Sequence, residues 1–391
     1  MMSFHPILVT NLLALLVFVI WLYLAFLRGN FWRLELEEDS SDPKPLEKWP
    51  HVIAIVPARN EAATIVRAVT SLLGQKYPGE FEIIAVDDQS DDGTAALARK
   101  AAEEAGWAAR ITVHAASELP PGWTGKLWAL NEGISAISGN APDFFWFTDA
   151  DIVHAPDTLQ RLVFRAETES LDLASLMVLL QAKTFPEKLL IPPFLYFFLM
   201  LYPPRWIADL QKRTAGAAGG CILMRRAALE RIGGLASIRN EVIDDCALAR
   251  AVKNTGGRLW MGVTRTSMSL REYKTFAEIR DLIARTAFTQ LHYSTLLLIA
   301  TLLGLFVTYW LPWILFFAGE DPAWLLGSTA ASLMTVTFLF AVKFYNRSVI
   351  LALTLPFAAA FYGYATFLSA VRYWLGRGAQ WKGRSQAPSG S

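Results

Sequence analysis

The stretch DFFWFTDAD, residues 143–151, places four consecutive aromatic residues and a threonine directly before two aspartates. Such an apolar run is typical of a buried strand, and residues two apart at a strand end project to the same side. The side chains of Asp149 and Asp151 should therefore converge. Two carboxylates suit Mg²⁺ or Mn²⁺, which bind carboxylates together with phosphate oxygens and water. A solvated loop or a helix cap is the alternative, but the position after a buried strand favours a metal site.

Strand and helix patterns alternate around this stretch. They predict strands at residues 51–57, 81–88, 109–115 and 143–151, and helices at residues 61–73, 94–105 and 126–137. This alternation indicates parallel βαβ units, whose functional loops follow the carboxyl ends of the strands. The residues at those ends are acidic or small, as a ligand crevice requires: Pro57 to Asn60, Asp87 with Asp88, and Asp149 with Asp151.

The second of these strand ends is VDDQSDDGT, residues 86–94. Asp91 and Asp92 can turn the chain and cap the next helix, and Gly93 supplies a permissive backbone. Capping does not require the first acidic pair. Asp87 and Asp88 are therefore left at the strand end, where a carboxylate can accept hydrogen bonds from a ribose or a base edge.

The composition places part of the chain in lipid. Hydrophobic residues make up 53% of the 391 residues, and the mean hydropathy is +0.32. Residues 7–27 carry no charge and are long enough to cross a hydrocarbon core of about 30 Å as a helix. Residues 295–317, 323–342 and 349–374 complete a predicted bundle of four transmembrane helices. Because 36 basic and 35 acidic residues nearly balance, we expect no nucleic-acid partner.

The chain is predicted to have four parts. They are an N-terminal transmembrane helix at residues 1–30, an α/β domain at 48–290, three transmembrane helices at 294–375 and a polar tail at 376–391. Residues 188–207 are aromatic-rich and contain two Pro-Pro pairs, too broken for a span, so we expect them at the membrane interface. A buried amphipathic helix of the soluble domain is the alternative. Arg28 and Arg33 follow the first helix and favour a cytoplasmic α/β domain.

Four motifs occur along the α/β region in the order VPARNEAATI, VDDQSDDGT, GKLWALNEG and FTDAD. In this order and at these separations, they resemble family 2 glycosyltransferases of the GT-A fold, over roughly Val52 to Arg285. The chain looks most similar to the hopanoid-biosynthesis-associated membrane glycosyltransferases, and more distantly to ceramide glucosyltransferase. The resemblance implies a Rossmann-like, nucleotide-sugar-binding α/β domain of the GT-A fold beside an α-helical transmembrane bundle.

The resemblance also implies roles for single residues. Asp88 would contact the donor nucleotide, and Asp149 with Asp151 would hold Mg²⁺ or Mn²⁺ on its diphosphate. Lys126 stands where the family motif has its lysine, and a cation has an electrostatic use beside a diphosphate. The expected donor-binding residues are Pro57, Arg59, Asn60, Glu61, Asp87, Asp88, Lys126, Asn131 and Asp149. Lys126 could instead be an exposed helix residue, and Glu61 a charge in the first turn of a helix.

The segment EVIDDCALA, residues 241–249, holds the expected catalytic pair. Similar enzymes carry an acidic pair there, and by that alignment Asp245 matches the presumed base. Asp244 replaces the more usual glutamate, which leaves open the separate roles of Asp244 and Asp245 in catalysis. A carboxylate within reach of an acceptor hydroxyl can take its proton during attack. The alternative is an acidic pair that only stabilises a helix N-terminus.

Many membrane relatives have a QxxRW motif near the acceptor site, and this chain has ARTAFTQLHYS instead, residues 284–294. Arg285 could neutralise the leaving diphosphate, and Gln290 or His292 could orient the acceptor headgroup. His292 could equally be an interfacial residue without a catalytic role. The missing Trp weakens any transfer of acceptor-site details from processive synthases or from ceramide glucosylation.

The sequence thus predicts an inverting, metal-dependent hexosyltransferase with its catalytic domain on the cytoplasmic side of a bacterial inner membrane. The expected donor is a nucleotide diphosphate sugar, and a UDP-sugar is the preferred candidate. The expected acceptor is a membrane lipid such as a hopanoid. A polyprenyl-phosphate glycosyltransferase or a polysaccharide synthase is the alternative of the same fold. A non-catalytic lipid-binding scaffold is the alternative from another class, but its mark would be eroded carboxylates, and Asp88, Asp149, Asp151 and Asp245 are present.

Overall fold

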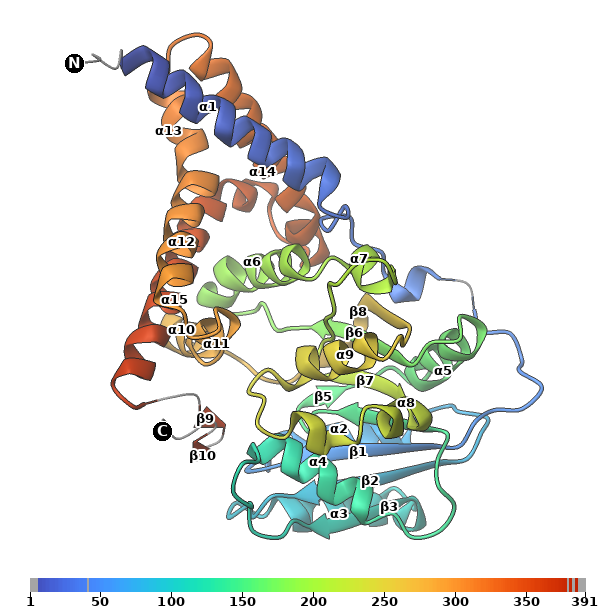
Figure 1. Cartoon of the computed structure of the whole chain (residues 1–391). Coiled ribbons are helices and arrows are strands. Elements are labelled where there is room, and N and C mark those ends of the chain that lie inside the picture. The colour runs from blue at the N-terminus through green and yellow to red at the C-terminus, as the bar shows by residue number, and fades with distance from the viewer. Residues whose placement is uncertain (1–5, 41, 378–379, 382–383, 386–391) are drawn as a thin grey trace. The chain divides into compact units, whose positions relative to one another are not determined.

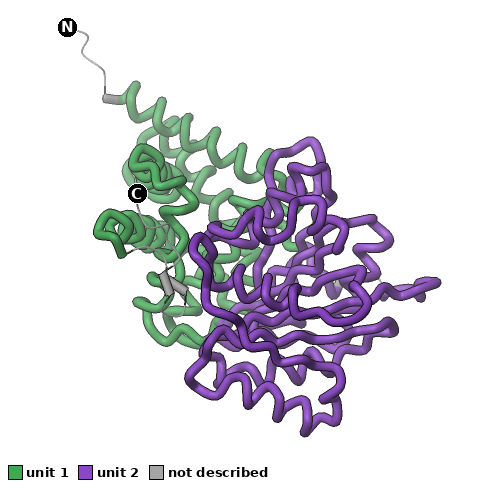
Figure 2. Tube along the Cα trace, turned by 60° about the horizontal axis from the view of Figure 1, so that its bottom comes forward, with its two compact units in different colours: residues 1–34, 182–205, 272–378 green, residues 35–181, 206–271, 379–391 purple. Residues whose placement is uncertain are grey.

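The computed structural model describes residues 6–40, 42–377, 380–381 and 384–385, so most of the predicted polar tail lies outside the described residues. The chain divides into two compact units (Figure 2). The first comprises residues 1–34, 182–205 and 272–378 and is helical, and the second comprises residues 35–181, 206–271 and 379–391 and contains the large sheet. The domain limits drawn from the sequence stay predictions.

Within the described part of the second unit, eight strands form one sheet in the order β3-β2-β1-β4-β7-β6-β8-β5 (Figure 1). They are β1 Val52–Ala58, β2 Phe81–Asp87, β3 Ile111–Ala115, β4 Phe144–Thr148, β5 Ile152–Val153, β6 Leu173–Leu179, β7 Cys221–Arg225 and β8 Leu259–Ser269. Strands β3, β2, β1 and β4 are parallel, whereas β7 is antiparallel to both β4 and β6. The predicted α/β class is confirmed.

The predicted elements of the parallel half are all present. Helices α2 Ile65–Leu73, α3 Thr94–Glu104 and α4 Gly125–Ser135 connect the parallel strands, and their limits differ from the predicted ones by four residues or fewer. The other elements of this unit are α5 Thr158–Thr168, α7 Pro204–Ala208 at its boundary, α8 Arg226–Arg231, α9 Asp244–Asn254, the 3₁₀ helices η2 Glu37–Asp39, η3 Ala108–Arg110 and η4 Leu235–Ile238, and strands β9 Gln380–Trp381 and β10 Arg384–Ser385. The sequence patterns do not predict β6 and β7, because periodicity cannot assign a short, continuous apolar run to a strand or to a helix.

Both faces of the central strands are covered by helices. All seven residues of β1 are buried, as expected of a parallel strand with helices on either side. Val52 and Val56 belong to the same core cluster as Ile65 of α2. On the other face, Gly133 of α4 lies so close to β1 that a Cβ atom there would come within 2.5 Å of Ile55 Cγ2. The glycine of GKLWALNEG therefore allows α4 to pack tightly on the sheet.

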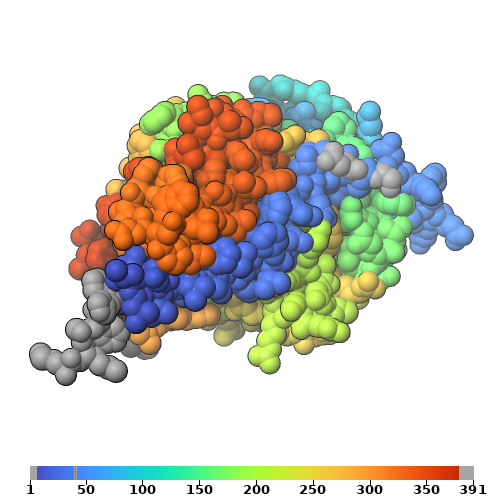
Figure 3. Space-filling model, turned by 90° about the horizontal axis from the view of Figure 1, so that it is seen from above, coloured from blue at the N-terminus to red at the C-terminus, as the bar shows by residue number. Residues whose placement is uncertain are grey.

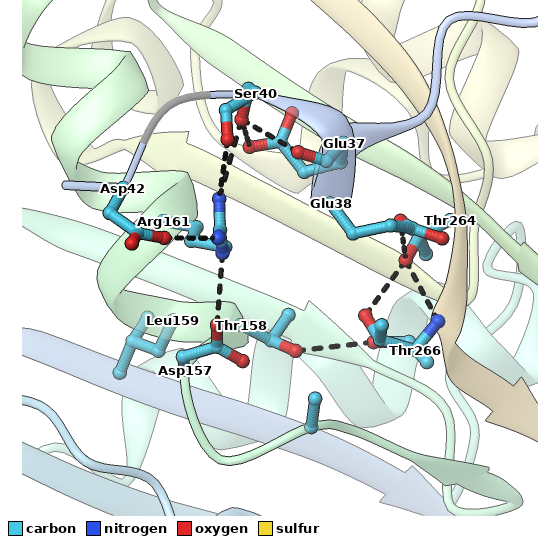
Figure 4. Close-up of polar contacts among 12 residues, drawn as sticks. Glu37, Glu38, Ser40, Asp42, Asp157, Thr158, Leu159, Arg161, Thr264 and Thr266 are labelled. Carbon is cyan, nitrogen blue, oxygen red and sulfur yellow. Dashed lines mark hydrogen bonds and ion pairs between the residues drawn. The ribbon is translucent and has the colours of Figure 1, made fainter.

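A short segment before β1 is attached to the edge of the second unit by polar contacts (Figure 4). Arg161 of α5 donates to carboxylate oxygens of Asp42 and Asp157, each at 2.9 Å. Glu38 accepts from the Thr264 hydroxyl at 2.9 Å and from the Arg265 backbone N–H at 2.8 Å. These contacts fix the linker that follows the first helix onto α5 and β8.

The first unit is built from apolar helices. They are α1 Pro6–Leu22, continued by the π-type segment η1 Tyr23–Leu27, α6 Phe185–Leu201, α10 Phe276–Ala284, α11 Ala287–Gln290, α12 Thr295–Leu305, η5 Phe306–Trp310, α13 Leu311–Ala318, α14 Ala323–Phe344, η6 Val349–Thr354 and α15 Leu355–Trp374. The α1 helix packs beside α13 and α14 (Figure 3). Near its end, Trp21 Nε1 donates to Thr308 O at 2.8 Å.

Five helical stretches in the described chain are long and apolar enough to cross a membrane. Four of them are the predicted spans, and the fifth is Phe185–Ala208, which includes the segment expected at the interface. The two Pro-Pro pairs predict a broken segment, whereas α6 runs without interruption through Pro192 and Pro193. The interfacial placement of residues 188–207 stays a prediction.

The start of α6 explains how a helix with internal prolines is held in place. Thr184 and Glu187 form a capping box, in which each side chain bonds the backbone N–H of the other residue. Glu187 is fully buried and also accepts from the backbone N–H groups of Lys183 at 2.8 Å and Tyr273 at 2.6 Å. One carboxylate therefore fixes both the entry to α6 and the segment before α10.

Replacing Gly133 by alanine should destabilise the second unit by about 1–3 kcal/mol, because the new methyl group would overlap Ile55 and force α4 away from the sheet. The measurement is the thermal unfolding midpoint of the purified full chain. Gly304→Ala is the matched control, since a Cβ there meets nothing within 4 Å. An unchanged midpoint for Gly133→Ala would contradict the packing described here.

Candidate active site

The loops after β1 and β2 are bonded to each other at one edge of the sheet. Asp88 is fully buried, and its backbone N–H donates to Ala58 O at 2.8 Å. Arg59 Nη1 donates to Asp88 O at 2.5 Å and lies 3.6 Å from Asp88 Oδ2. The side-chain oxygen of Asn60 accepts from the backbone N–H of Asp91 at 3.1 Å. The structure thus brings together Arg59, Asn60 and Asp88, which the sequence predicts as donor-binding residues.

The second acidic pair of VDDQSDDGT supports the start of α3. Asp92 Oδ1 accepts from the backbone N–H of Thr94 at 3.0 Å, and Asp92 Oδ2 accepts from that of Ala62 at 2.9 Å. Gly93 has φ +87°, a left-handed conformation that glycine adopts without strain. The Glu61 backbone N–H donates to Thr94 Oγ1 at 2.8 Å, so the loop that carries Glu61 is fixed to the same turn.

The two carboxylates of the FTDAD motif follow β4 directly, because β4 ends at Thr148. Burial, and after it the charges of Asp149 and Glu61, raise the pKa of Asp151 to about 6, with Arg271 and Lys126 opposing the rise. Burial is the main cause of the raised pKa, and the negative charges of Asp149 and Glu61 add to it. Added positive charge would therefore stabilise the ionised pair.

A buried histidine that the sequence analysis did not select supports this strand end. His154 Nε2 lies 2.8 Å from Thr148 Oγ1, and His154 Nδ1 lies 3.0 Å from Ser267 Oγ. Thr148 Oγ1 also lies 3.0 Å from the carbonyl oxygen of Gly220. Burial lowers the pKa of His154 to about 3, so the ring is neutral at physiological pH. His154 therefore positions the residue before Asp149, and no motif in the sequence marks it.

Lys126 connects the strand end to the start of α9. It lies in the first turn of α4, and its ammonium Nζ is 2.7 Å from Asp149 Oδ1 and 3.6 Å from Asp244 Oδ2. Burial by itself lowers the pKa of Lys126, but the charges of Asp149 and Asp244 hold it well above its ordinary value. The alternative of an exposed helix residue is wrong, since only 17% of the side chain is exposed.

Asp245 is held by backbone groups rather than by Lys126. Its Oδ2 accepts from the Gly219 N–H at 2.9 Å and its Oδ1 from the Cys246 N–H at 2.7 Å. A Cβ on Gly219 would lie 3.1 Å from Asp245 Oδ2, so the glycine permits this close approach. Burial, and after it the charge of Asp244, raise the pKa of Asp245 to about 6 against the opposing charge of Lys126.

Both aspartates lie in the first turn of α9, so the helix dipole stabilises them, as the alternative interpretation expects. They also line a pocket. Its polar lining is Lys126, Thr148, Asp149, Gly219, Asp244 and Asp245, and its apolar lining is Pro57, Leu127, Leu130, Phe147, Ile222, Leu235 and Leu248. The predicted residues Asp87, Asp88, Asn131 and Asp151 belong to the neighbouring strand ends and to α4 and do not line this pocket. Gly219 is the main addition, and the Gly-rich run GAAGG is its only sequence signal.

The three residues predicted from ARTAFTQLHYS belong to the first unit. Arg285 ends α10, and Gln290 Oε1 accepts from the Tyr202 hydroxyl at 2.8 Å. His292 has φ +50° in the turn before α12. The roles proposed for Arg285, Gln290 and His292 on the acceptor side stay predictions.

The donor set at the FTDAD motif fits a hard divalent cation. In the described chain, three potential His or acidic ligand atoms come within 4.8 Å of one another only at His51, Glu80 and Glu82, which lie at the start of β1 and β2 and so at the opposite end of the sheet. No such group among the described residues includes Asp149 or Asp151, so the FTDAD motif offers a cation at most these two carboxylates. Mg²⁺ commonly takes one or two carboxylates and completes its shell with phosphate oxygens and water.

The whole fold is similar to that of the mannosyltransferase PcManGT from Pyrobaculum calidifontis, solved in complex with GDP-Man and Mn²⁺. The TM-score is 0.55 at 20% sequence identity, over 93% of this chain and 99% of that chain. The sheet and its loops thus define a GT-A glycosyltransferase fold.

The sequence comparison is more specific. Residues 53–233 match the family described as glycosyl transferase family 2.

Two relatives are similar over part of the chain. An N-acetylglucosaminyltransferase of Mesorhizobium japonicum is 29% identical over 199 residues, which are 49% of this chain and 43% of that protein. The succinoglycan biosynthesis protein ExoO of Rhizobium meliloti is 33% identical over 135 residues, 34% of each. The chain thus spans less than half the length of these curated relatives.

Replacing Lys126 by methionine should destabilise the protein by about 1–3 kcal/mol at pH 7.5, because the partly exposed carboxylates of Asp149 and Asp244 would keep their charges without the ammonium. The pKa of Lys126 is raised, so its stabilising contribution is fully present below its ordinary pKa, and pH 7.5 tests all of it.

Mn²⁺ should then raise the unfolding midpoint of Lys126→Met more than that of the wild type, since no ammonium competes for Asp149. Lys100→Met, at a side chain that is 68% exposed, is the control. Equal Mn²⁺ shifts in Lys126→Met and wild type would contradict this competition.

Proposed function

We propose that this protein is a membrane glycosyltransferase that moves a sugar from a nucleotide diphosphate donor to a membrane lipid and inverts the anomeric carbon. One observation supports this most strongly. Lys126, Asp149 and Asp245, which come from α4, the end of β4 and α9, line one pocket, and residues 53–233 match glycosyl transferase family 2. The pocket thus contains a positive charge for the diphosphate, from Lys126, and a base for the acceptor, Asp245.

The donor would bind across the carboxyl ends of β1, β2 and β4. Arg59 is bonded to Asp88 and Asn60 to Asp91 there, and a carboxylate such as that of Asp88 can recognise a ribose or a base edge. A divalent cation held by Asp149 and Asp151 would supply positive charge to the diphosphate. Lys126, already 2.7 Å from Asp149, would add a second positive charge to the leaving group. A UDP-sugar is the first donor to test.

The proposed reaction is a single displacement. The acceptor hydroxyl oxygen bonds to the anomeric carbon while the bond from that carbon to the diphosphate oxygen breaks, and the electron pair leaves with the nucleoside diphosphate. The hydroxyl proton passes to Asp245. Two backbone N–H groups fix this carboxylate, and a pKa of about 6 leaves it ionised at pH 7 and still able to accept a proton. Asp244, 3.6 Å from Lys126, would instead hold the ammonium in place.

The acceptor is proposed from the rest of the chain. Five helices apolar enough for a membrane accompany the glycosyltransferase domain, and Arg28 and Arg33 favour a cytoplasmic pocket in a bacterial inner membrane. A lipid could then present its hydroxyl without leaving the bilayer, and the sequence resemblance suggests a hopanoid. Polysaccharide synthesis is the second candidate, because one relative is named for succinoglycan biosynthesis.

The test is sugar transfer by the purified full chain in lipid discs. Radiolabelled UDP- and GDP-sugars are supplied with bacterial lipid extracts that contain or lack hopanoids. We expect label in the organic-soluble lipid fraction, loss of transfer on chelation and recovery with Mg²⁺ or Mn²⁺. Label found only in a water-soluble polymer would favour the polysaccharide candidate, and absence of transfer from every donor would contradict an enzymatic role.

Asp245→Asn should lower kcat/KM by about 10²- to 10⁴-fold, the usual contribution of a general base. In the wild type, kcat/KM should fall about tenfold per pH unit below pH 6, because the raised pKa of Asp245 protonates the base there. The variant should lose the share of this acid limb that Asp245 causes, while the share of Asp151, whose pKa is also raised to about 6, remains. Asp157→Asn, at the half-exposed residue directly before α5, is the matched control. A variant that keeps both its rate and its acid limb would remove Asp245 from the mechanism.

A further inference from the structure

The loop of residues 206–214 in the second unit is held at its base by one lysine. Lys253 of α9 donates from Nζ to the carbonyl oxygens of Trp206 at 3.0 Å, Ile207 at 2.8 Å and Thr214 at 2.7 Å. Three bonds from a single ammonium bring the two ends of the loop together. The conformation of the residues between them is therefore well defined.

The tip of this loop is also ordered by local bonds. Asp209 Oδ1 accepts from the Gln211 backbone N–H at 2.8 Å, and Asp209 O accepts from that of Lys212 at 3.2 Å. The turn leaves Leu210 with 58% of its surface exposed. A single exposed apolar side chain is common on protein surfaces, so Leu210 is informative only together with the charges and the aromatic ring beside it.

The charges beside Leu210 indicate what would cover it. Within residues 206–214, the positive charges of the exposed Lys212 and Arg213 outnumber the single negative charge of Asp209. Lys212 Nζ lies 5.4 Å from the ring centroid of Trp206. An apolar tip flanked by a Trp ring and basic side chains is the composition of segments that lie at a bilayer surface, where anionic headgroups attract cations.

The covalent chain keeps this loop close to an apolar helix. Helix α6 ends at Leu201, nine residues before Leu210, and belongs to a stretch long and apolar enough to cross a membrane. Nine residues span at most about 30 Å when fully extended, so Leu210 stays within this reach of the end of α6. A soluble protein partner would not need this connection, whereas a bilayer surface explains it.

We propose that the 206–214 loop contacts the bilayer, with Leu210 inserted among the headgroups and with Lys212 and Arg213 bound to anionic phospholipids. The loop leads through residues 215–218 to Gly219, which lines the pocket and bonds Asp245. Lipid bound at the tip would thus lie a few residues along the chain from Gly219, the glycine that bonds the proposed base Asp245. This contact does not depend on which sugar is transferred or on whether transfer occurs.

The test is the depth of a spin label at position 210. Leu210→Cys in the full chain is labelled with a nitroxide and reconstituted in phosphatidylcholine vesicles with or without phosphatidylglycerol. The native Cys221 and Cys246 are buried, so the label should attach at position 210. Trp107→Cys, at an exposed site in the turn before β3, is the matched control. Collision rates with O₂, which partitions into lipid, and with a water-soluble nickel chelate report the depth.

We expect the label at position 210 to favour O₂ over nickel, most strongly with phosphatidylglycerol, and the label at position 107 to favour nickel. Lys212→Gln with Arg213→Gln should remove the effect of phosphatidylglycerol. Equal behaviour of the two labels would overturn the bilayer contact, and low collision rates with both reagents would indicate a protein partner and overturn it as well. An unchanged lipid effect in the double variant would overturn the role of the two basic residues. The readout needs no activity, so it is independent of the proposed transfer.

Discussion

The pocket depends on one set of contacts, the ion pairs that the mostly buried ammonium of Lys126 forms with Asp149 and Asp244. A buried charge is tolerated only when opposite charges or hydrogen bonds compensate it, and here Asp149 and Asp244 do so from the end of β4 and the start of α9. The same arrangement separates the two acidic residues of α9. Asp244 lies toward the ammonium, whereas Asp245 is held by the N–H groups of Gly219 and Cys246.

The mixed sheet makes this meeting possible. Strand β7 pairs antiparallel with β4, with Thr148 opposite Cys221, so the amino end of β7 lies beside the carboxyl end of β4. Gly219 and Gly220, which precede β7, therefore lie beside Asp149, which follows β4. In an all-parallel sheet, the glycines before a strand would lie at the opposite edge from the acidic loops. The antiparallel direction of β7 thus places a backbone N–H donor, that of Gly219, at the end of the sheet where the acidic side chains lie.

The helical unit obeys a different constraint, since backbone groups in lipid must be satisfied within the protein. Helices satisfy most of them, and the breaks in the helices need other partners. Glu187 shows one solution, because its carboxylate accepts from Lys183, Thr184 and Tyr273 where two separate parts of the chain enter the unit. This single residue links α6 to the segment before α10, and both segments are joined directly to the second unit along the chain.

The parallel half of the sheet, the four long apolar helical stretches and the acidic strand ends can be predicted from the sequence, because each depends on local periodicity or on adjacent residues. The helical limits of α2, α3 and α4 follow for the same reason. Strands β6 and β7 cannot be predicted in this way, because their short apolar runs carry no period, and neither can the continuity of α6, where contacts outweigh two prolines. His154 and Gly219 also escaped prediction, since a lone histidine and a glycine-rich run carry no signal without their partners. One pocket is shared by Lys126, Asp149, Asp244, Asp245 and Gly219. No local pattern predicts this, because strand order and direction are set by long-range packing.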